Sequence, residues 1–480
     1  MPPEQEPLPF ESEIEAPPRL ARPEDEDEDE DAEGTDPDDE APTEGKRKRK
    51  KKRRRGKPKR RNLDDDTTLP RQTVHCHAPD DQCCPTCGNA LSVIGKARSL
   101  RVEWVPGHFI IQEFLRDKCA CSKHPGEGVL TVPGPTALDR AMCGNGLLAR
   151  VLVDKFADHL PLNRQAGRMG REGFEVGSNT LSGWVLQASP LAHVLALAVR
   201  QQVCEAPALQ GDDTGHPVQD GGNGHLRKGR LWVFTDQEQA FYAFTPTKEG
   251  VYPAELLKDY AGTMLLVDGG SEFNQAVREH DLERSGCWSH LRTYFWKALP
   301  HHPHEADLAL GTINDLFMLE REHWGTMVAE EIRARRQEHS KPLVDGFYRW
   351  VNGISTTVRP KSPLGAAIRY ARNQEGSLRV FLDRGELPMH NNLSELLLRQ
   401  PVVGRKNWLF SRSEGGAKAA ADYFTLIGSC MLQGIDPHAY LVDVLPRVMD
   451  HPAHRIHEFT PKSWRLAHKK QGTSEAPRPS

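Results

Sequence analysis

The middle of this 480-residue chain contains two apolar, strand-like segments that each run into an aspartate. The lead-in at 207–209 continues through Gln-Gly to Asp212, and the uninterrupted apolar segment 263–267 ends at Asp268. Short apolar runs of this kind are typical of buried strands. Between the two aspartates lie segments with the pattern of an antiparallel hairpin and then of a short helix with an early proline: 231–235, 239–244 and 253–260.

The order strand–Asp, hairpin, helix, strand–Asp constrains the fold more than any other feature of the sequence. It is the order of an α/β domain with an RNase H-like core, in which the two carboxylates end up on neighbouring strands. Carboxylates placed in this way can hold two divalent cations about 4 Å apart, which bridge the attacking and leaving oxygens of an in-line phosphoryl transfer. Hard oxygen ligands favour Mg²⁺ or Mn²⁺. The pattern therefore predicts a two-metal site at Asp212 and Asp268.

A third acid is expected to complete such a site, and Glu395 is the candidate. It ends the segment His-Asn-Asn-Leu-Ser-Glu at 390–395, where an asparagine cap opens a helix and places the glutamate in the first turn. Each of these acids taken alone is more often a helix cap or a surface carboxylate than a metal ligand. The prediction therefore depends on the ordered set of three.

Charge is strongly segregated along the chain. Residues 1–45 hold 19 acids and two arginines, whereas residues 46–61 hold 14 Lys/Arg. Neither segment has enough apolar surface to fold, so residues 1–62 are predicted to be a disordered acidic and then basic tail. Lys46, Arg55 and Arg60 represent a basic arm that would bind DNA phosphates with a steep salt dependence. The alternative is a solubilising tail that folds back on the acidic block.

Six of the ten cysteines fall within 46 residues, which favours a metal site over disulfides in a chain with no secretory signal. Cys84 and Cys87 form a Cys-Pro-Thr-Cys-Gly knuckle, and Cys121 and His124 repeat the two-residue gap. Together they predict a tetrahedral structural zinc site, with Cys119 as the alternative to Cys121. The competing interpretation is a set of unliganded thiols. The four remaining cysteines are interpreted as small buried hydrophobes.

A helix-turn-helix outline follows the cysteine-rich segment. Helical spacing extends over 147–159, a short helix occupies 162–168, and two glycines precede Ser178, Asn179 and Thr180, which open a third helix. Three short helices are common in any α-domain, so the pattern by itself is weak. Its position after a basic arm and a zinc module favours DNA binding at the start of the third helix.

The 126 residues between Asp268 and Glu395 exceed what the bare fold needs, and their spacing predicts a helical insertion at about 287–378. His290 and Arg292 open this insertion. They are interpreted either as contacts to the scissile DNA end or as residues that tie the insertion to the sheet.

Basic side chains surround an aromatic residue after Glu395. Arg399, Arg405 and Lys406 flank Trp408, which is a pattern suited to a DNA backbone with a base to stack on. For Trp408 itself, burial next to a solvated basic loop is the favoured interpretation, since large aromatics are usually buried.

From about residue 69 to residue 464 the chain resembles the transposases of the insertion-sequence 66 family. The matching motifs follow one another in order, and they are Cys-Pro-Thr-Cys-Gly at 84–88, Leu-Pro-Leu-Asn-Arg-Gln at 160–165, Asp-Asp-Thr at 212–214, Val-Asp-Gly at 267–269, Cys-Trp-Ser-His-Leu-Arg at 287–292, Lys-Ser-Pro-Leu-Gly at 361–365, Asn-Asn-Leu-Ser-Glu at 391–395, Gly-Arg-Lys-Asn-Trp-Leu-Phe at 404–410 and Gly-Ile-Asp-Pro at 434–437.

This resemblance implies a DDE-type transposase in which Asp212, Asp268 and Glu395 form the metal-binding triad. It also implies double-stranded DNA partners (element ends and target), a homo-oligomer and accessory proteins of the element. The sequence departs from the family pattern at His390, where an aspartate is usual, and at Leu396, where an arginine is usual. Further departures are Thr293 in place of an arginine and His124 in place of a cysteine.

Two other functions remain open on the sequence. The intact acids favour catalysis, whereas the missing arginines favour a catalytically inactive, transposase-derived DNA-binding protein. A nuclease that cuts without joining is the third alternative. No apolar stretch long enough for a membrane span and no signal sequence are recognised, so a cytoplasmic, nucleoid-associated bacterial protein is expected. The expected domains are 1–62 (tail), 63–130 (zinc-binding), 131–190 (helix-turn-helix), 200–428 (catalytic) and 429–480 (C-terminal segment).

Overall fold

The computed structural model describes residues 107–114, 118–120, 129–131, 134, 136–138, 141–219, 225–323 and 327–471. The described residues from Ile110 onward belong to one compact unit. Most of the predicted zinc site and the whole basic arm lie outside the described residues: Lys46, Arg55, Arg60, Cys84, Cys87, Cys121 and His124. Cys119 lies in β1 (Lys118–Ala120), which pairs with β2 (Val129–Thr131) in an antiparallel ladder.

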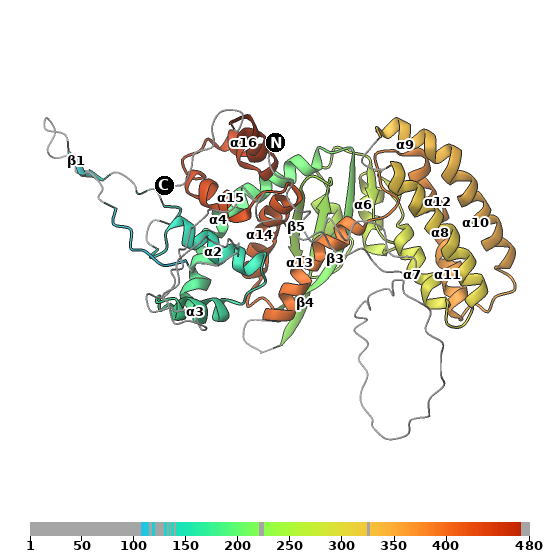
Figure 1. Cartoon of the computed structure of the whole chain (residues 1–480), viewed down its shortest axis with the longest axis horizontal. Coiled ribbons are helices and arrows are strands. Elements are labelled where there is room, and N and C mark those ends of the chain that lie inside the picture. Colours follow the sequence, from blue (N-terminus) through green and yellow to red (C-terminus); the bar gives the residue numbers. More distant parts are fainter. Residues whose placement is uncertain are drawn as a thin grey trace, which may run out of the picture. The chain divides into compact units, whose positions relative to one another are not determined.

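A five-stranded mixed sheet forms the centre of the unit (Figure 1). Its strands are β3 (Ala208–Gln219), β4 (Leu226–Thr235), β5 (Ala240–Thr245), β6 (Met264–Leu266) and β7 (Glu283–Ser285), in the order β5-β4-β3-β6-β7. The β3–β4 and β4–β5 pairs are antiparallel, whereas the β3–β6 and β6–β7 pairs are parallel. The predicted hairpin is confirmed, with Thr235 opposite Ala240, and so is the predicted strand before Asp268.

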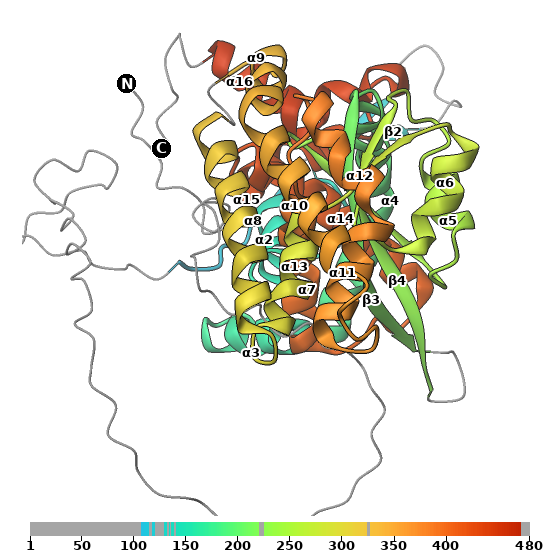
Figure 2. The same cartoon turned by 90° about the vertical axis from the view of Figure 1, so that its right-hand side faces the viewer.

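Helices cover both faces of this sheet because its strands carry apolar side chains on both sides. On one face Trp232 and Phe234 pack edge-on against Phe273 of η1 (Ser271–Phe273). On the other face Tyr242 contacts Phe424 of α14 (Glu414–Leu432). Figure 2 shows α5 (Val251–Leu256) and α6 (Asn274–Glu279) on one side, and α13 (Asn392–Trp408) and α14 on the other.

In the part of the chain that the structure describes, the helices before the sheet are α2 (Asn145–Phe156), α3 (Leu162–Arg171) and α4 (Ser178–Cys204). The predicted cap at the third helix is wrong in detail, because Gly177 is the N-cap residue and no side chain caps the helix. The helix also continues through Pro190 to Cys204, so the expected domain boundary at 190 falls inside it. Packing overrides the proline here, since α4 lies against α14 and the Tyr423 hydroxyl donates to the Val185 carbonyl (2.6 Å).

Among the described residues, α4 is the one helix long and apolar enough to cross a membrane, by length and composition only. Half of the most apolar 18-residue stretch of α4 is buried inside the unit. Its buried side chains pack against α14 and β5. These contacts explain why α4 is apolar: it is a helix of the core.

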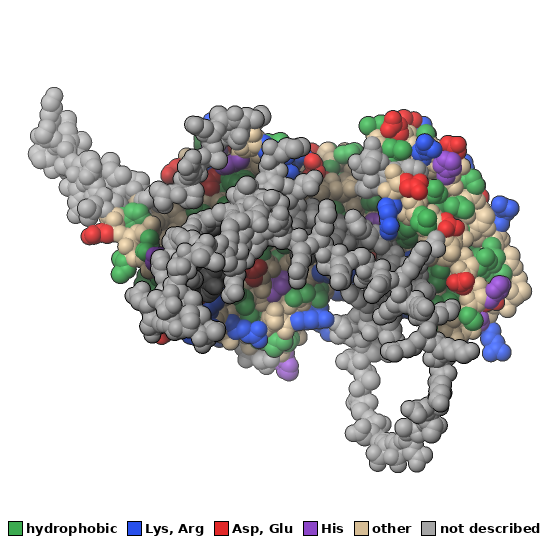
Figure 3. Space-filling view, viewed as in Figure 1, with side chains coloured by type: hydrophobic (Ala, Val, Ile, Leu, Met, Phe, Trp, Pro, Cys, Tyr) green, Lys and Arg blue, Asp and Glu red, His purple; other side chains and the backbone are tan. Residues whose placement is uncertain are grey.

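The predicted insertion is helical and has a core of its own (Figure 1). Its elements are α7 (Trp288–Ala298), α8 (Pro303–His323), α9 (Ala329–Arg335), the π-helical turn η2 (Arg336–Ser340), α10 (Lys341–Ile354), α11 (Pro363–Asn373), α12 (Glu375–Arg379) and η3 (Val380–Asp383). Trp288, Phe295 and Phe347 pack together at its centre. Arg336 is fully buried and pairs with Glu320. On the face seen in Figure 3, acidic, basic and histidine side chains are interspersed over these helices.

The C-terminal part adds α15 (Pro437–Val444), η4 (Leu445–Arg447), η5 (Ala453–Phe459) and α16 (Pro461–Gln471). Asp436 caps α15 by accepting from the His438 amide (3.0 Å). The Tyr440 hydroxyl donates to the Phe459 carbonyl (2.7 Å), and α15 packs on α2. The expected domain boundary at 428–429 lies inside α14, which is one continuous helix.

Candidate active site

The two predicted aspartates lie on neighbouring parallel strands. Asp212 is inside β3, and Asp268 follows the end of β6 by two residues. The β3–β6 register pairs Gln210 with Leu266, so its continuation by two residues places Asp212 opposite Asp268. Each carboxylate is oriented by a main-chain amide, from Asp213 to Asp212 (2.7 Å) and from Gly270 to Asp268 (2.9 Å).

Glu395 comes to the same place from a different element. It lies in the first turn of α13, and this helix packs against β3. Asn391 occupies the predicted cap position but makes no side-chain capping bond; instead its carbonyl accepts from the Ser394 hydroxyl (2.8 Å). The Glu395 side chain is 39% exposed, so the site is open to solvent on its side.

The charges of the three acids interact. Burial, together with the negative charges of Glu395 and Asp268, raises the pKa of Asp212 well above its usual range. A carboxylate that accepts a main-chain hydrogen bond normally has a lowered pKa. At Asp212 burial and, after it, the charges of the two other acids outweigh this hydrogen bond. The structure therefore brings together all three predicted acids.

His290 lies at the edge of this cluster, on α7. Its Nδ1 is 3.4 Å from Glu395 Oε1. Burial disfavours the imidazolium, yet the interactions with Cys287, a hydrogen bond among them, and the charges of Glu395 and Asp268 raise the pKa of His290 well above its usual value. Cys287 is buried, as predicted for the scattered cysteines, but its position beside His290 and Glu395 was not predicted. The signal in the sequence is the Cys-x-x-His spacing at 287–290.

Two residues that the sequence did not single out fix the loop after β6. Arg284 of β7 donates hydrogen bonds to the carbonyls of Asp268 and Gly270. Gly269 faces the ring of Tyr370 on α11, where an added Cβ would lie 2.9 Å from a ring carbon. The loop that carries Asp268 is thus held by the half-buried guanidinium of Arg284 and by an aromatic ring.

Arg292 is separated from His290 by helix geometry, because residues two apart on a helix point to different faces. Its side chain is buried at 7% exposure, and its guanidinium lies 5.8 Å from the centre of the Trp296 ring. Burial lowers the pKa of Arg292. In the part of the chain that the structure describes, its Nε and Nη2 donors have no hydrogen-bond partner. Buried guanidinium donors of this kind would suit an anion.

The predicted basic residues after Glu395 all lie on α13. Arg405 reaches back to β3 and donates to the Gly215 carbonyl, so it connects the helix to the sheet. Arg399 and Lys406 are exposed. Arg405 therefore has a structural contact with the sheet.

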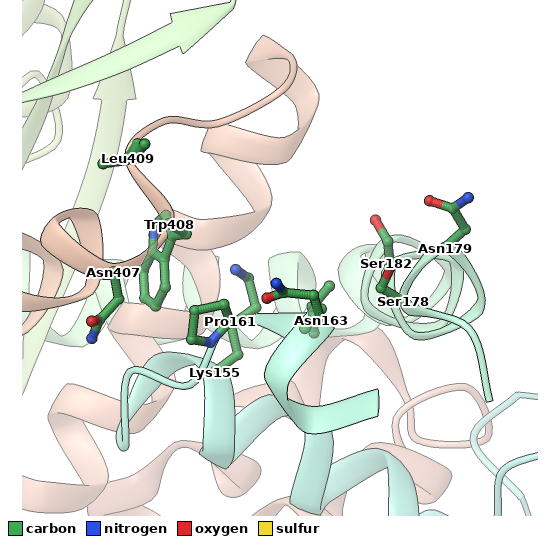
Figure 4. Close-up of a pocket in the computed structure, with 10 residues that line it drawn as sticks. Lys155, Pro161, Asn163, Ser178, Asn179, Ser182, Asn407, Trp408 and Leu409 are labelled. Atoms are coloured by element: carbon green, nitrogen blue, oxygen red, sulfur yellow. The ribbon is translucent and has the colours of Figure 1, made fainter. Parts of the chain in front are cut away.

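Trp408 is half-buried at the end of α13, rather than fully buried. It lines a cavity of about 390 Å³ that lies between this helix end and the first turns of α3 and α4 (Figure 4). Ser178 and Asn179 are on the opposite side of the cavity from Trp408. The Lys155 ammonium lies 4.2 Å from the centre of the indole ring, and burial lowers the pKa of this amine to about 8. Thr180 is exposed in the same turn of α4.

Comparison with known proteins identifies one family over most of the chain. The family model described as "Transposase IS66 family" matches residues 140–419, and that described as "IS66 C-terminal element" matches residues 425–461. Uncharacterized proteins of Sinorhizobium fredii are similar over most of their lengths. Protein y4hP is 31% identical, covering 85% of this chain and 78% of the relative. Protein y4jD is 27% identical, covering 83% of this chain and 81% of the relative.

Proposed function

The chain belongs to the IS66 transposase family, and from this premise we propose that it is a DDE-type transposase that cuts and joins DNA. Its substrate is double-stranded DNA that carries the terminal inverted repeats of an insertion sequence. Water first hydrolyses a phosphodiester at the element end and frees a 3′-hydroxyl. That hydroxyl then attacks a phosphodiester of the target DNA, which forms the new bond and releases a target 3′-hydroxyl.

The observation that carries this proposal is the convergence of Asp212, Asp268 and Glu395. Their oxygen donors fit Mg²⁺ or Mn²⁺, and the charges of Glu395 and Asp268, which act on Asp212, would be offset by a bound cation. We propose that these three residues hold two such ions. When bound, the ions supply Lewis-acid activation of the attacking oxygen and neutralise charge on the leaving oxygen.

The strand order supports an RNase H-like core. Three antiparallel strands in the order β5-β4-β3 are extended by β6 and β7, which run parallel to β3. This places the first and fourth strands of the sheet side by side, and the first two acids come from that pair of strands. Helices on both faces complete the α/β arrangement.

The chain's own residues would orient the DNA around this site. Main-chain amides hold the first two acids, and Arg284 fixes the loop after β6. The buried guanidinium of Arg292 is suited to a DNA phosphate. The packing of α2, α3 and α4 supports a helix-turn-helix, which would present Asn179 and Thr180 to the inverted repeats. The basic arm and a structural Zn²⁺ module at 63–130 remain part of the proposal.

Joining two element ends calls for at least two active sites, so we propose a homo-oligomer that works with accessory proteins of the element. The place of action is the cytoplasm, at the bacterial nucleoid, where the DNA substrate is. Neither statement depends on the geometry of the acids.

A strand-transfer assay tests the proposed function. DNA carrying the element's own ends is incubated with the full chain, target DNA and Mg²⁺ or Mn²⁺, in the presence of the element's other proteins. We expect metal-dependent joining by the wild type and a loss of at least 10³-fold for Asp268→Asn. Asp281→Asn, which neutralises an exposed acid in the turn before β7, is the matched control and should retain joining.

The same assay separates the alternatives. Cleavage without joined product would identify a nuclease. Salt-sensitive binding without cleavage, by wild type and Asp268→Asn alike, would refute catalysis and leave a transposase-derived DNA-binding protein.

A further inference from the structure

A cysteine, a histidine and a glutamate converge beside the proposed catalytic acids. One potential ligand atom from each of Cys287, His290 and Glu395 lies within 4.8 Å of the other two. His290 Nδ1 lies 3.4 Å from Glu395 Oε1. Among the described residues this is the one group of three or more such side chains with that geometry.

The local structure explains why these three meet. Cys287 is the N-cap residue of α7, and His290 follows one turn later on the same side of the helix. The Trp288 amide donates to the Met389 carbonyl (3.0 Å), which holds the start of α7 beside the segment that leads into α13. Glu395 then enters from the first turn of α13. Two helix starts are thus held together by a main-chain hydrogen bond.

The ligand types differ from those of the three-acid site. A thiolate, an imidazole and a carboxylate suit Zn²⁺ or Co²⁺, whereas Mg²⁺ prefers oxygen ligands. Bond lengths of about 2.0–2.3 Å place the ligand atoms of one tetrahedral zinc roughly 3–4 Å apart. The three atoms need small movements to reach that spacing. Three protein ligands also leave a fourth position open, as in zinc sites that bind water or substrate.

The charges at this place favour a cation. The carboxylate of Glu395 lies 3.4 Å from His290 Nδ1, and the charge of Asp268 acts on the same imidazole. A divalent cation held by the imidazole would be attracted by both carboxylates.

We propose that Cys287, His290 and Glu395 form a binding site for a thiophilic divalent cation of the Zn²⁺ class, distinct from the oxygen-ligand site of the three acids. Glu395 belongs to both sites. An ion held by the sulfur and nitrogen ligands therefore draws this carboxylate away from the catalytic ions, so Zn²⁺ inhibits strand transfer. The inhibition rests on the proposed function, whereas the binding site itself does not.

Cobalt binding to the full chain tests the site directly. Co²⁺ bound by a thiolate gives a sulfur-to-metal charge-transfer band, and atomic absorption after gel filtration gives the metal content. We expect Cys287→Ser and His290→Gln each to bind one equivalent less per chain than the wild type, with a weaker charge-transfer band. Cys143→Ser is the matched control, because this cysteine is also buried but lies outside the cluster.

The expected zinc ligands near residues 84–124 are present in every variant, so their contribution cancels in the difference. Circular dichroism shows whether each variant is folded. If Cys287→Ser does not fold, the cobalt content of His290→Gln decides whether the site exists. Equal cobalt content in the wild type and a folded variant would overturn the site. Glu395→Gln should weaken Co²⁺ binding at least tenfold; unchanged affinity would remove Glu395 from it.

The inhibition is measured within each protein by comparing the amount of joined DNA with and without Zn²⁺ at constant Mg²⁺. Zn²⁺ should reduce joining at least tenfold for the wild type and for Cys143→Ser, and less than twofold for Cys287→Ser. An equal fall in Cys287→Ser would overturn the inhibition. If no protein joins DNA, the proposed function fails, while the cobalt measurement still decides the binding site.

Discussion

Neutralising Asp212 should stabilise the metal-free protein, although this residue is one of the three proposed metal ligands. Burial and the charges of Glu395 and Asp268 raise its pKa well above the ordinary value of 3.8. Between pH 3.8 and the raised pKa, the folded state binds more protons than the unfolded state. The stability contributed by protonated Asp212 is therefore lost as the pH rises through this window. Once the side chain is ionised, it destabilises the fold.

The size of the effect follows from the sheet geometry. Neighbouring strands are about 4.8 Å apart, so Asp212 and Asp268 face each other across roughly that distance. Two unit charges about 5 Å apart repel by about 3 kcal/mol at an effective dielectric constant of about 20. Solvent reaches Glu395 and screens part of this repulsion. We therefore expect Asp212→Asn to raise the free energy of unfolding by about 1–3 kcal/mol.

Differential scanning calorimetry in EDTA at neutral pH measures this gain as a rise in Tm. Glu320→Gln is the matched control, because it neutralises a buried acid whose neighbour is a cation. This substitution leaves the fully buried Arg336 without its ionic partner, so the free energy of unfolding of the variant should fall by about 3 kcal/mol. Added Mn²⁺ should raise the Tm of the wild type more than that of Asp212→Asn. A fall in Tm for Asp212→Asn comparable to that for Glu320→Gln would refute the charge-repulsion argument.

Two further predictions concern buried histidines and a helix contact. Burial lowers the pKa of His216 and His390 to about 4. Each neutral ring therefore contributes stability that is lost as the pH falls from about 6.5 to about 4, and the free energy of unfolding should fall by up to about 3 kcal/mol for each histidine. Urea unfolding of His216→Gln should show a shallower pH dependence; an unchanged slope would contradict this. Gly404→Ala should cost about 1–3 kcal/mol, because its Cβ would lie 2.2 Å from the Trp408 ring. Gly415→Ala, which meets nothing closer than 3.9 Å, should be neutral or stabilising, and equal losses would refute the contact.

The sequence was sufficient to place the first two acids because their positions depend on local patterns and chain order. One apolar strand runs into Asp212 and a second runs into Asp268. The two strands pair in a parallel register with no bulge between them. The hairpin and the helical insertion were predictable for the same reason, since their periodicities are local. Glu395 required the family resemblance as well, because an asparagine-capped glutamate has no distinctive spacing.

The remaining features depend on contacts between distant segments. Arg405 contacts Gly215 across 190 residues, and no local pattern encodes that pair. Pro190 normally predicts a helix end, yet α4 continues through it because its buried face packs on α14. The position of Cys287 beside Glu395 likewise depends on the hydrogen bond that joins the start of α7 to residue 389.

The same acids explain why the site needs so much structural support. Like charges on Asp212, Asp268 and Glu395 repel one another, so the surrounding fold must oppose their separation. It does so with a register of parallel strands, with the hydrogen bonds from Arg284 to the loop after β6, and with the packing of α13 on β3. These restraints keep the carboxylates close before any cation binds. A cation would then have to move side chains but not the strands and the helix that carry them, which is the physical advantage of holding a destabilised cluster on a rigid sheet.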